Sequence, residues 1–190
     1  MAGPPSRSLT VLAVAVIVAV VGGWSVASYN RIVPAQQAVD AQWAQVESVY
    51  QRRADLVPNL VSVTQAYLVQ EREVLQSVLR ARESYAQASP RSPDRVEAAD
   101  RLDQAIGRVL AVIERYPELR SRDVVLQLMD ELAGTENRIA VERRRYNERV
   151  RQYNGLVLGF PRTLIARAAG FGPRPYFRAD LDAATAPKVP

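Results

Sequence analysis

The stretch "QRRADLVPNL" (residues 51–60) places a proline inside a segment that otherwise has helical periodicity. Pro58 has no N–H group, so a helix that runs through it leaves the carbonyl of Ala54 without its helical donor. The chain can respond by turning back at Pro58, or by continuing as one kinked helix. Which of the two happens decides how many helices the protein has.

Apolar residues on both sides of Pro58 recur every three or four positions, which is typical of a helix that packs along another helix. This stripe consists of Val39, Trp43, Val46, Tyr50, Val57, Leu60, Tyr67, Val74, Val78 and Tyr85. The same rhythm places the polar side chains Arg53, Thr64 and Glu71 on the stripe. The alternation that marks strands is absent throughout, so the sequence predicts an all-α fold.

Two further helices follow in the sequence. "ASPRSPDR" (88–95) breaks the first pattern, and Ser92-Pro93-Asp94 has the cap, proline and acidic residue of a helix start. A second stripe then runs from Val96 to Tyr116 and stops at Pro117. The last helix begins at Ser121 or Asp123 and ends near "GF" (159–160), before Pro161.

Helix lengths favour a turn at Pro58. A single helix over 35–88 would be more than twice as long as the helix over about 93–116 that has to cover it. A turn near "DLVPN" (55–59) instead divides the chain into four helices of about 22, 30, 24 and 37 residues, which suit an up-down bundle. We therefore expect an elongated antiparallel bundle of 3–4 long helices, with three helices and a kink at Pro58 as the alternative.

"LTVLAVAVIVAVVGGWSVAS" (9–28) contains no charged residue. As a helix it spans the roughly 30 Å hydrocarbon core of a bilayer. A cleaved signal peptide is the alternative, because "SVA" (25–27) resembles a cleavage site, but the apolar run exceeds the usual length of such a peptide. We expect a short flank (1–8) and an uncleaved transmembrane helix (9–28), with the bulk of the chain leaning to the extracytoplasmic side.

The composition excludes several kinds of active site. The chain has no Cys and no His, which removes thiol nucleophiles, imidazole bases, ordinary zinc sites and Glu-x-x-His di-iron sites. None of its glycines form a phosphate-binding motif. We expect no enzyme activity, catalytic residue, cofactor, metal or small-molecule ligand.

Positive charge is concentrated towards the carboxy terminus. Residues 143–178 contain nine Arg and one acid, Glu148, while the whole chain has a net charge of +5. Candidate contacts for an anionic group or a partner are Arg143, Arg144, Arg145, Arg162, Arg167 and Arg174. For Arg143, Arg144 and Arg145 the competing interpretation is a solvated helix face, with only the aliphatic part of the Arg143 side chain packed against another helix. No nucleic acid is expected, because no reading motif accompanies the charge.

The apolar residues among these arginines allow two interpretations. Phe160, Leu164, Ile165, Phe171, Tyr176 and Phe177 can seal one end of the bundle, which we favour, or can lie in a membrane interface. Polar residues beside the helical stripes form a candidate buried network: Arg53, Glu71, Thr135 and Glu136. Arg53 with Glu136 is one such pairing. Tyr146-Asn147 and Tyr153-Asn154 recur seven residues apart, which puts both tyrosines on one face and favours packing.

Four blocks of the sequence stand out: "YNRIV" (29–33), "QWAQVESVYQRRADLVPNLV" (42–61), "YPELRSRDVVLQLMDELAGTENRIAVERRRYNERVRQYN" (116–154) and "FPRTLIARAAGFGPRPYF" (160–177). In this order and spacing they resemble the LemA family of bacterial proteins. Thr163, Glu142 and Ala169 depart from residues common in the family. The resemblance implies a membrane anchor followed by a LemA-like helical bundle over 29–178, and it supplies no reaction. Within that bundle we distinguish an aromatic and basic segment (160–178), and we expect residues 179–190 to be disordered.

These features favour a membrane-anchored scaffold or interaction protein of the bacterial cell envelope. Its expected partners are the lipid bilayer, through residues 9–28, and either another protein or a second copy of the chain. The alternative is a membrane-interface protein that binds or remodels lipid through its basic carboxy-terminal segment.

Overall fold

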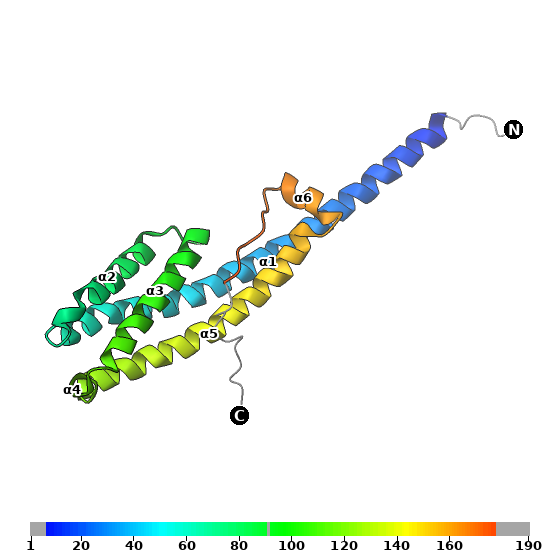
Figure 1. Cartoon of the computed structure of the whole chain (residues 1–190). Coiled ribbons are helices and arrows are strands. Elements are labelled where there is room, and N and C mark those ends of the chain that lie inside the picture. The colour runs from blue at the N-terminus through cyan, green and yellow to red at the C-terminus, as the bar shows by residue number, and fades with distance from the viewer. Residues whose placement is uncertain (1–6, 91, 178–190) are drawn as a thin grey trace, which may run out of the picture. The chain divides into compact units, whose positions relative to one another are not determined.

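The computed structural model of the chain describes residues 7–90 and 92–177 (Figure 1). Its elements are α1 (Arg7–Thr64), the 3₁₀ turn η1 (Val69–Glu71), α2 (Arg72–Gln87), α3 (Pro93–Ile113), α4 (Pro117–Arg120), α5 (Asp123–Leu158) and α6 (Arg162–Ala168). No strand occurs in these two ranges, so the predicted all-α fold is confirmed. The tail expected to be disordered, 179–190, and residues 1–6 of the expected flank lie outside the described residues.

The chain divides into two compact units, and the boundaries fall within α1 and α5. Among the described residues, unit 1 contains 7–40 and 148–174. Unit 2 contains 41–147, apart from residue 91, together with 175–177. Each unit is described by itself below.

Helix α1 begins with the apolar segment and continues into the packed part of the chain. Every residue from Leu9 to Trp24 is exposed, and the segment is apolar enough to cross a membrane, with a mean hydropathy of 2.4. From Ser28 onward the helix has a buried side that includes Ile32 and Val39. The first part of α1 therefore fits a membrane anchor, and the rest has the amphipathic pattern of a bundle helix.

The expected turn at Pro58 is wrong, because α1 runs through this proline and ends at Thr64. Pro58 faces solvent, whereas its neighbours Val57 and Leu60 are fully buried, so the packing stripe passes the proline without interruption. The carbonyl of Ala54, which Pro58 deprives of a donor, accepts a hydrogen bond from Arg82 of α2. The helix stays intact because Val57 and Leu60 are buried and because Arg82 replaces the missing N–H donor.

The reversal occurs after Thr64 instead, which also corrects the alternative of one helix over 35–88. Main-chain N–H groups of Tyr67 and Leu68 both donate to the carbonyl of Thr64, at 3.0 and 2.9 Å, and η1 leads into α2. Because the chain leaves the helical path here, Tyr67 is exposed although the stripe places it inside. Leu68 is buried in its place.

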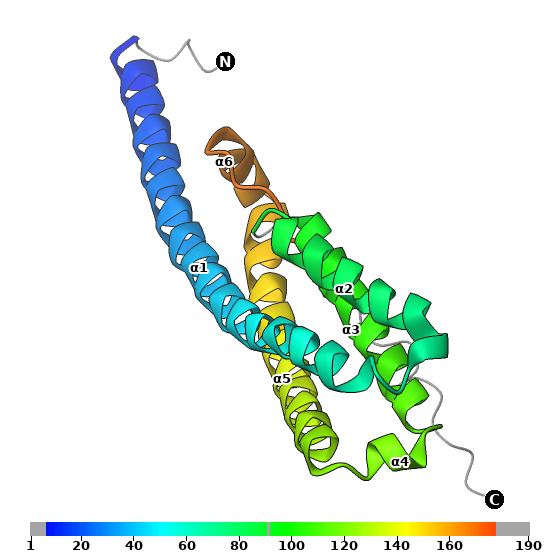
Figure 2. The same ribbon diagram turned by 90° about the vertical axis from the view of Figure 1, so that its left-hand side faces the viewer.

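Unit 2 is an up-down arrangement of the second part of α1, α2, α3 and the first part of α5 (Figure 2). Helix α3 starts as predicted, because Ser92 caps it by accepting a hydrogen bond from the N–H of Arg95 at 3.1 Å, with Pro93 at its first position. The largest side chains fully buried in this unit include Tyr50, Leu60, Leu102, Ile106, Ile113 and Leu132. They come from α1, α3 and α5, so these helices share one core.

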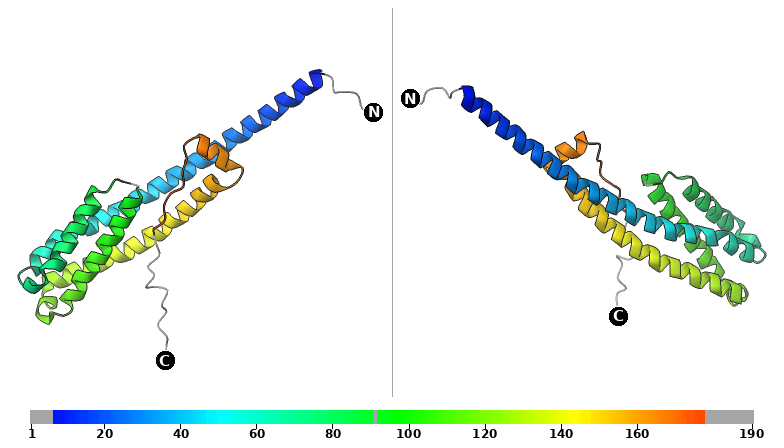
Figure 3. Two further views of the ribbon diagram at one scale, coloured as in Figure 1. Left: turned by 45° about the horizontal axis from the view of Figure 1, so that its top comes forward. Right: turned by 180° about the vertical axis from the view of Figure 1, so that it is seen from behind.

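Unit 1 consists of the first part of α1, the end of α5, α6 and the extended residues 171–174 (Figure 3). After α6 the backbone of Gly170 has a φ of 79°, in the left-handed region that a glycine adopts without strain. This conformation lets the N–H of Phe171 donate to the carbonyl of Ala166 at 2.8 Å. The chain then returns along α5.

Candidate functional site

A charged cluster lies inside unit 2, formed by Tyr50 and Arg53 of α1, Asp100 and Asp103 of α3, and Arg143 of α5. Arg143 is 2.6 Å from Asp100 and 2.8 Å from Asp103, and it also donates a hydrogen bond to the hydroxyl of Tyr50. Arg53 Nε is 3.2 Å from Asp103. The cluster links three helices through side chains whose charges balance.

Burial changes the titration of these groups. Removal from water raises the pKa of Asp103, although the positive charges of Arg53 and Arg143 oppose this shift. Burial also raises the pKa of the Tyr50 hydroxyl well above its ordinary value, and Asp103 adds to this effect. Burial opposes the charged form of Arg143, but Tyr50 and the two aspartates raise its pKa overall. Arg143 is therefore a cation whose partly buried charge is stabilised by Tyr50, Asp100 and Asp103.

One guanidinium nitrogen of Arg143 is engaged by groups within unit 2. Its terminal nitrogen is engaged by Tyr50, Asp100 and Asp103, and its carbon lies 4.9 Å from the centre of the Phe177 ring. This placement resembles the competing interpretation of the sequence, in which the side chain of Arg143 packs against neighbouring helices. A role in binding a partner through Arg143 remains a prediction.

The next two candidate arginines lie on the exposed side of α5 in unit 2. Arg144 donates to the carbonyl of Ala140 at 3.2 Å, and Arg145 forms an ion pair with Glu142 at 2.8 Å. Both arginine side chains are themselves exposed, so each guanidinium group can exchange its contact for one with a partner.

The remaining three candidate arginines belong to unit 1. Arg162 is partly exposed at the first position of α6, and Arg167 is exposed near its end. Arg174 forms an ion pair with Asp40 of α1 at 3.3 Å. Of these three, Arg174 is the one that the structure ties to α1.

The structure places the predicted polar network as follows. Arg53 is buried and lies 3.7 Å from Glu136, whose side chain is exposed. The hydroxyl of buried Thr135 donates to the carbonyl of Leu132 in its own helix at 2.8 Å. Glu71 is 3.2 Å from Arg115, so it belongs to a different pair. Arg53 and Glu136 are thus brought together, while Glu71 and Thr135 have other partners.

Sequence reasoning missed Asp100, Asp103 and a second buried arginine, Arg95. Arg95 is 2.6 Å from Glu47, donates to the carbonyl of Tyr85, and stacks 3.9 Å above the Tyr85 ring. Burial raises the pKa of that tyrosine to about 12. A sequence signal existed for Asp103, because it directly follows the stripe residue Leu102 and so borders the buried face.

Two asparagines hold the carboxy-terminal segment by its main chain, one in each unit. In unit 1, Asn154 accepts from the N–H of Arg174 at 2.8 Å and donates to its carbonyl at 2.9 Å. In unit 2, Asn147 makes the same pair of hydrogen bonds with Phe177, both at 2.9 Å. The repeat of Tyr-Asn at a spacing of seven predicted packing for the tyrosines, which are buried, but not this role of the asparagines.

The ring of Phe177 completes an aromatic group in unit 2. It stacks on Trp43 with centroids 5.6 Å apart and planes 8° apart, and meets Tyr146 edge-on at 5.4 Å. Phe177 is buried, so this end of the chain is part of the core. For Phe177 the structure agrees with packing at the bundle and not with a membrane interface.

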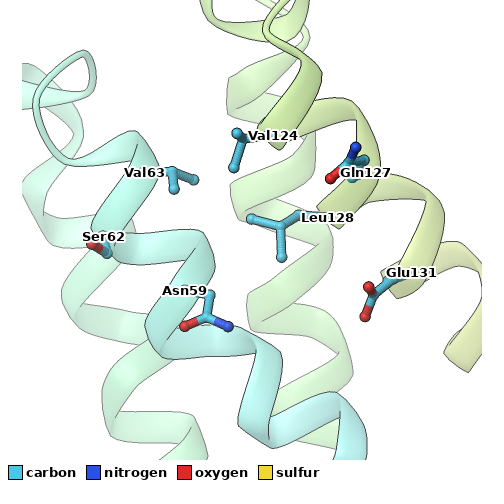
Figure 4. Close-up of a pocket in the computed structure, with 7 residues that line it drawn as sticks. All are labelled: Asn59, Ser62, Val63, Val124, Gln127, Leu128 and Glu131. Atoms are coloured by element: carbon cyan, nitrogen blue, oxygen red, sulfur yellow. The ribbon is translucent and has the colours of Figure 1, made fainter.

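A shallow pocket of about 280 Å³ lies between the end of α1 and the start of α5 in unit 2 (Figure 4). It is lined by Asn59, Ser62, Val63, Val124, Gln127, Leu128 and Glu131. A single carboxylate among two amides, one hydroxyl and aliphatic side chains provides neither an acid–base pair nor a set of metal ligands. Within residues 7–90 and 92–177, no group of three or more His, Cys, Asp or Glu could hold a metal ion.

A comparison of the sequence with models of protein families identifies the family of the helical part of the chain. Residues 42–190 match the sequence model of the LemA family. The chain belongs to the LemA family. The match covers the bundle helices and begins after the apolar part of α1.

Similar proteins include two that are named as magnetosome proteins. The chain is 26% identical to magnetosome protein MamQ 2 of Paramagnetospirillum magneticum, over 92% of this chain and 73% of that protein. It is 25% identical to magnetosome protein MamQ of Magnetospirillum gryphiswaldense, over 78% of this chain and 64% of that protein. Neither the family description nor these names assign a reaction.

Proposed function

We propose that this LemA-family chain is a single-pass protein of the bacterial cell envelope whose helical bundle serves as a scaffold or interaction module without catalysis. The observation that carries the proposal is the continuity of α1 from Arg7 to Thr64. The same helix presents an exposed apolar segment long enough to cross a bilayer and then contributes core residues such as Val57. An anchor that is also a bundle helix keeps the bundle at the membrane.

The chemistry of the buried groups supports a structural role. The aspartates of the charged cluster are paired with arginines that connect neighbouring helices. A carboxylate that is engaged in ion pairs between helices is less available as a general base. We therefore infer that the function is performed by surfaces.

The names of the relatives also support a structural role. They are named as magnetosome proteins, so they are components of a particular bacterial structure. By analogy, we propose that this chain is a component of an envelope structure, either through another protein or through self-association. We also propose that its short amino terminus is cytoplasmic and its bundle extracytoplasmic, since Arg7 precedes the apolar segment.

Site-specific photocrosslinking in intact cells tests the proposal. A photoreactive amino acid at the exposed positions Leu126, Val141 and Leu79 samples two helices of unit 2, α5 and α2. We expect one or a few discrete adducts, of the size of a dimer or a larger complex, and only from some positions. The matched control lacks residues 9–28 and should lose adducts that depend on the membrane. Absence of discrete adducts from all positions would exclude an interaction module.

A second candidate function is binding or remodelling of lipid by the carboxy-terminal segment. A specific observation favours it, because Phe160 is 84% exposed and Leu164 is 61% exposed. Side chains of this size at a water-exposed surface commonly mark an interaction site. The same segment contains Arg162 and Arg167, whose charge suits anionic head groups.

A further inference from the structure

The connection between α5 and α6, residues 158–164, exposes a group of large apolar side chains. Leu158 is 60% exposed, Phe160 84% and Leu164 61%. We call this segment the corner of unit 1. Of the aromatic residues that follow, Phe177 is buried and Phe171 contacts the ring of Tyr29 at 5.6 Å, whereas Tyr176 is 46% exposed. The corner therefore brings together three large apolar side chains that are more exposed than any of these aromatic residues.

Contacts within unit 1 place the corner near the point where the apolar segment of α1 ends. Arg174 is joined to Asn154 of α5 by two main-chain hydrogen bonds and to Asp40 of α1 by an ion pair, which aligns these two positions. From Asn154, α5 continues for only four residues to Leu158. From Asp40, α1 runs in the opposite chain direction towards Tyr29.

A second set of contacts links α6 to Tyr29 of α1. Its ring meets Phe171, whose N–H donates to the carbonyl of Ala166 in α6. Helix α6 has seven residues, so it is about 10 Å long. Figures 1 and 3 show α6 beside α1 where the free, blue part of α1 begins. The corner and α6 thus lie within about 10–15 Å of Tyr29.

Tyr29 directly follows the uncharged residues 9–28. If those residues span the hydrocarbon core, Tyr29 lies in the interfacial layer, which is about 5–8 Å thick on each side of a bilayer. Aromatic residues favour this layer, and amphipathic helices insert their apolar side chains into it. A corner with exposed Leu and Phe, held close to Tyr29, is in reach of the same layer.

We propose that the corner of unit 1 inserts into the head-group boundary of the bilayer that holds residues 9–28. Leu158, Phe160 and Leu164 contact the acyl chains, and Arg162 and Arg167 contact lipid phosphates. Arg174 and Phe177 are not part of this contact, because Asn154 holds the main chain of Arg174, and Asn147 and Trp43 hold Phe177. The proposal rests on the anchoring of α1 in the membrane, and it adds a second, interfacial contact.

The absence of native cysteine allows a direct test with the full-length chain. Single-cysteine variants Phe160→Cys and Leu164→Cys are labelled with an environment-sensitive fluorophore and reconstituted into phosphatidylethanolamine–phosphatidylglycerol vesicles. Val18→Cys reports on the anchor, and Leu126→Cys is the control for an exposed apolar position of unit 2. Lipids that carry a nitroxide quencher near the head group or deep in the acyl chain then report the depth of each label.

We expect the shallow quencher to act strongly on labels at 160 and 164, the deep quencher to act on the label at 18, and neither to act on the label at 126. Quenching at 18 without quenching at 160 and 164 would overturn the interfacial contact while leaving the anchor intact. Lack of quenching at 18 would overturn both the anchor and the inference that depends on it. Circular dichroism confirms that each labelled variant is folded.

The role of the arginines is tested by replacing Arg162 and Arg167 together with Gln. Quenching of the label at 160 should fall in vesicles with phosphatidylglycerol and change little in phosphatidylcholine vesicles. The matched control replaces the exposed residues Arg144 and Arg145 of unit 2 with Gln, which removes the same charge. An equal effect of both double variants would overturn the assignment of Arg162 and Arg167 to lipid phosphates.

Discussion

The guanidinium of Arg82 donates a hydrogen bond to the main-chain carbonyl of Ala54 at 3.0 Å. This carbonyl is the one that loses its helical donor because Pro58 has no N–H. A side chain of α2 thus stands in for the missing main-chain group of α1, and α1 continues to Thr64. The continuation of α1 beyond Pro58 depends on this contact and on the burial of Val57 and Leu60.

Replacing Arg82 with Ala should lower the free energy of unfolding by about 1–2 kcal/mol, because a partly buried carbonyl is left unpaired. In a Pro58→Ala background the helix regains its own N–H donor, so the same replacement should have a smaller effect. Urea denaturation of the four variants, followed by circular dichroism in detergent, measures the coupling. Equal effects in both backgrounds would show that Arg82 does not compensate for Pro58.

Replacing Arg143 with Ala should destabilise the protein by about 2–4 kcal/mol, because it removes the cation that neutralises the partly buried Asp100 and Asp103. Arg144→Ala on the neighbouring exposed position is the matched control and should change stability by less than about 0.5 kcal/mol. Denaturation curves compare the two. Similar small effects would indicate that Arg143 is available for a partner, as the sequence alone allowed.

The stability contributed by Asp103 should increase on acidification. Burial raises the pKa of this carboxyl, so the folded protein binds its proton more readily than the unfolded chain does. That contribution is full below the pKa of an unfolded Asp, about 3.9, and is lost as the pH rises through the folded pKa. Wild type should therefore gain stability relative to Asp103→Asn as the pH falls from about 7 to about 4.

Denaturation of both chains at several pH values measures that difference, and carboxylates far from the cluster titrate alike in the two. A loss of stability of wild type relative to Asp103→Asn on acidification would show that the ion pairs with Arg53 and Arg143 outweigh burial.

Replacing Asn147 with Ala should release the end of the carboxy-terminal segment, because the N–H and the carbonyl of Phe177 both lose their partner. Loss of two such hydrogen bonds destabilises the bound segment by about 1–3 kcal/mol. Chymotrypsin should then cleave faster after Tyr176 and Phe177. Asn137→Ala, at an exposed position of the same helix, is the control, and equal cleavage in both variants would contradict the role of Asn147.

Helical periodicity predicts some features of the candidate site and not others. The stripe predicts correctly that Arg53 and Thr135 lie on buried faces, because the facing direction of a side chain follows from helical geometry alone. It cannot predict that Arg53 and Arg143 both pair with Asp103, since α3 is a separate segment whose rotation about its own axis is set by packing. The two asparagines escaped notice for the same reason, because their partners lie 20 and 30 residues away.

The sequence by itself determined that the chain is helical, that residues 9–28 form an apolar segment and that thiol and imidazole chemistry is absent. These conclusions follow from composition and from periodicities within a few turns of one helix. The tertiary structure alone decided that the chain turns after Thr64 and not at Pro58, and which charges neutralise each other. Both outcomes depend on groups brought together from distant segments, such as Arg82 at the carbonyl of Ala54, and no local pattern encodes them.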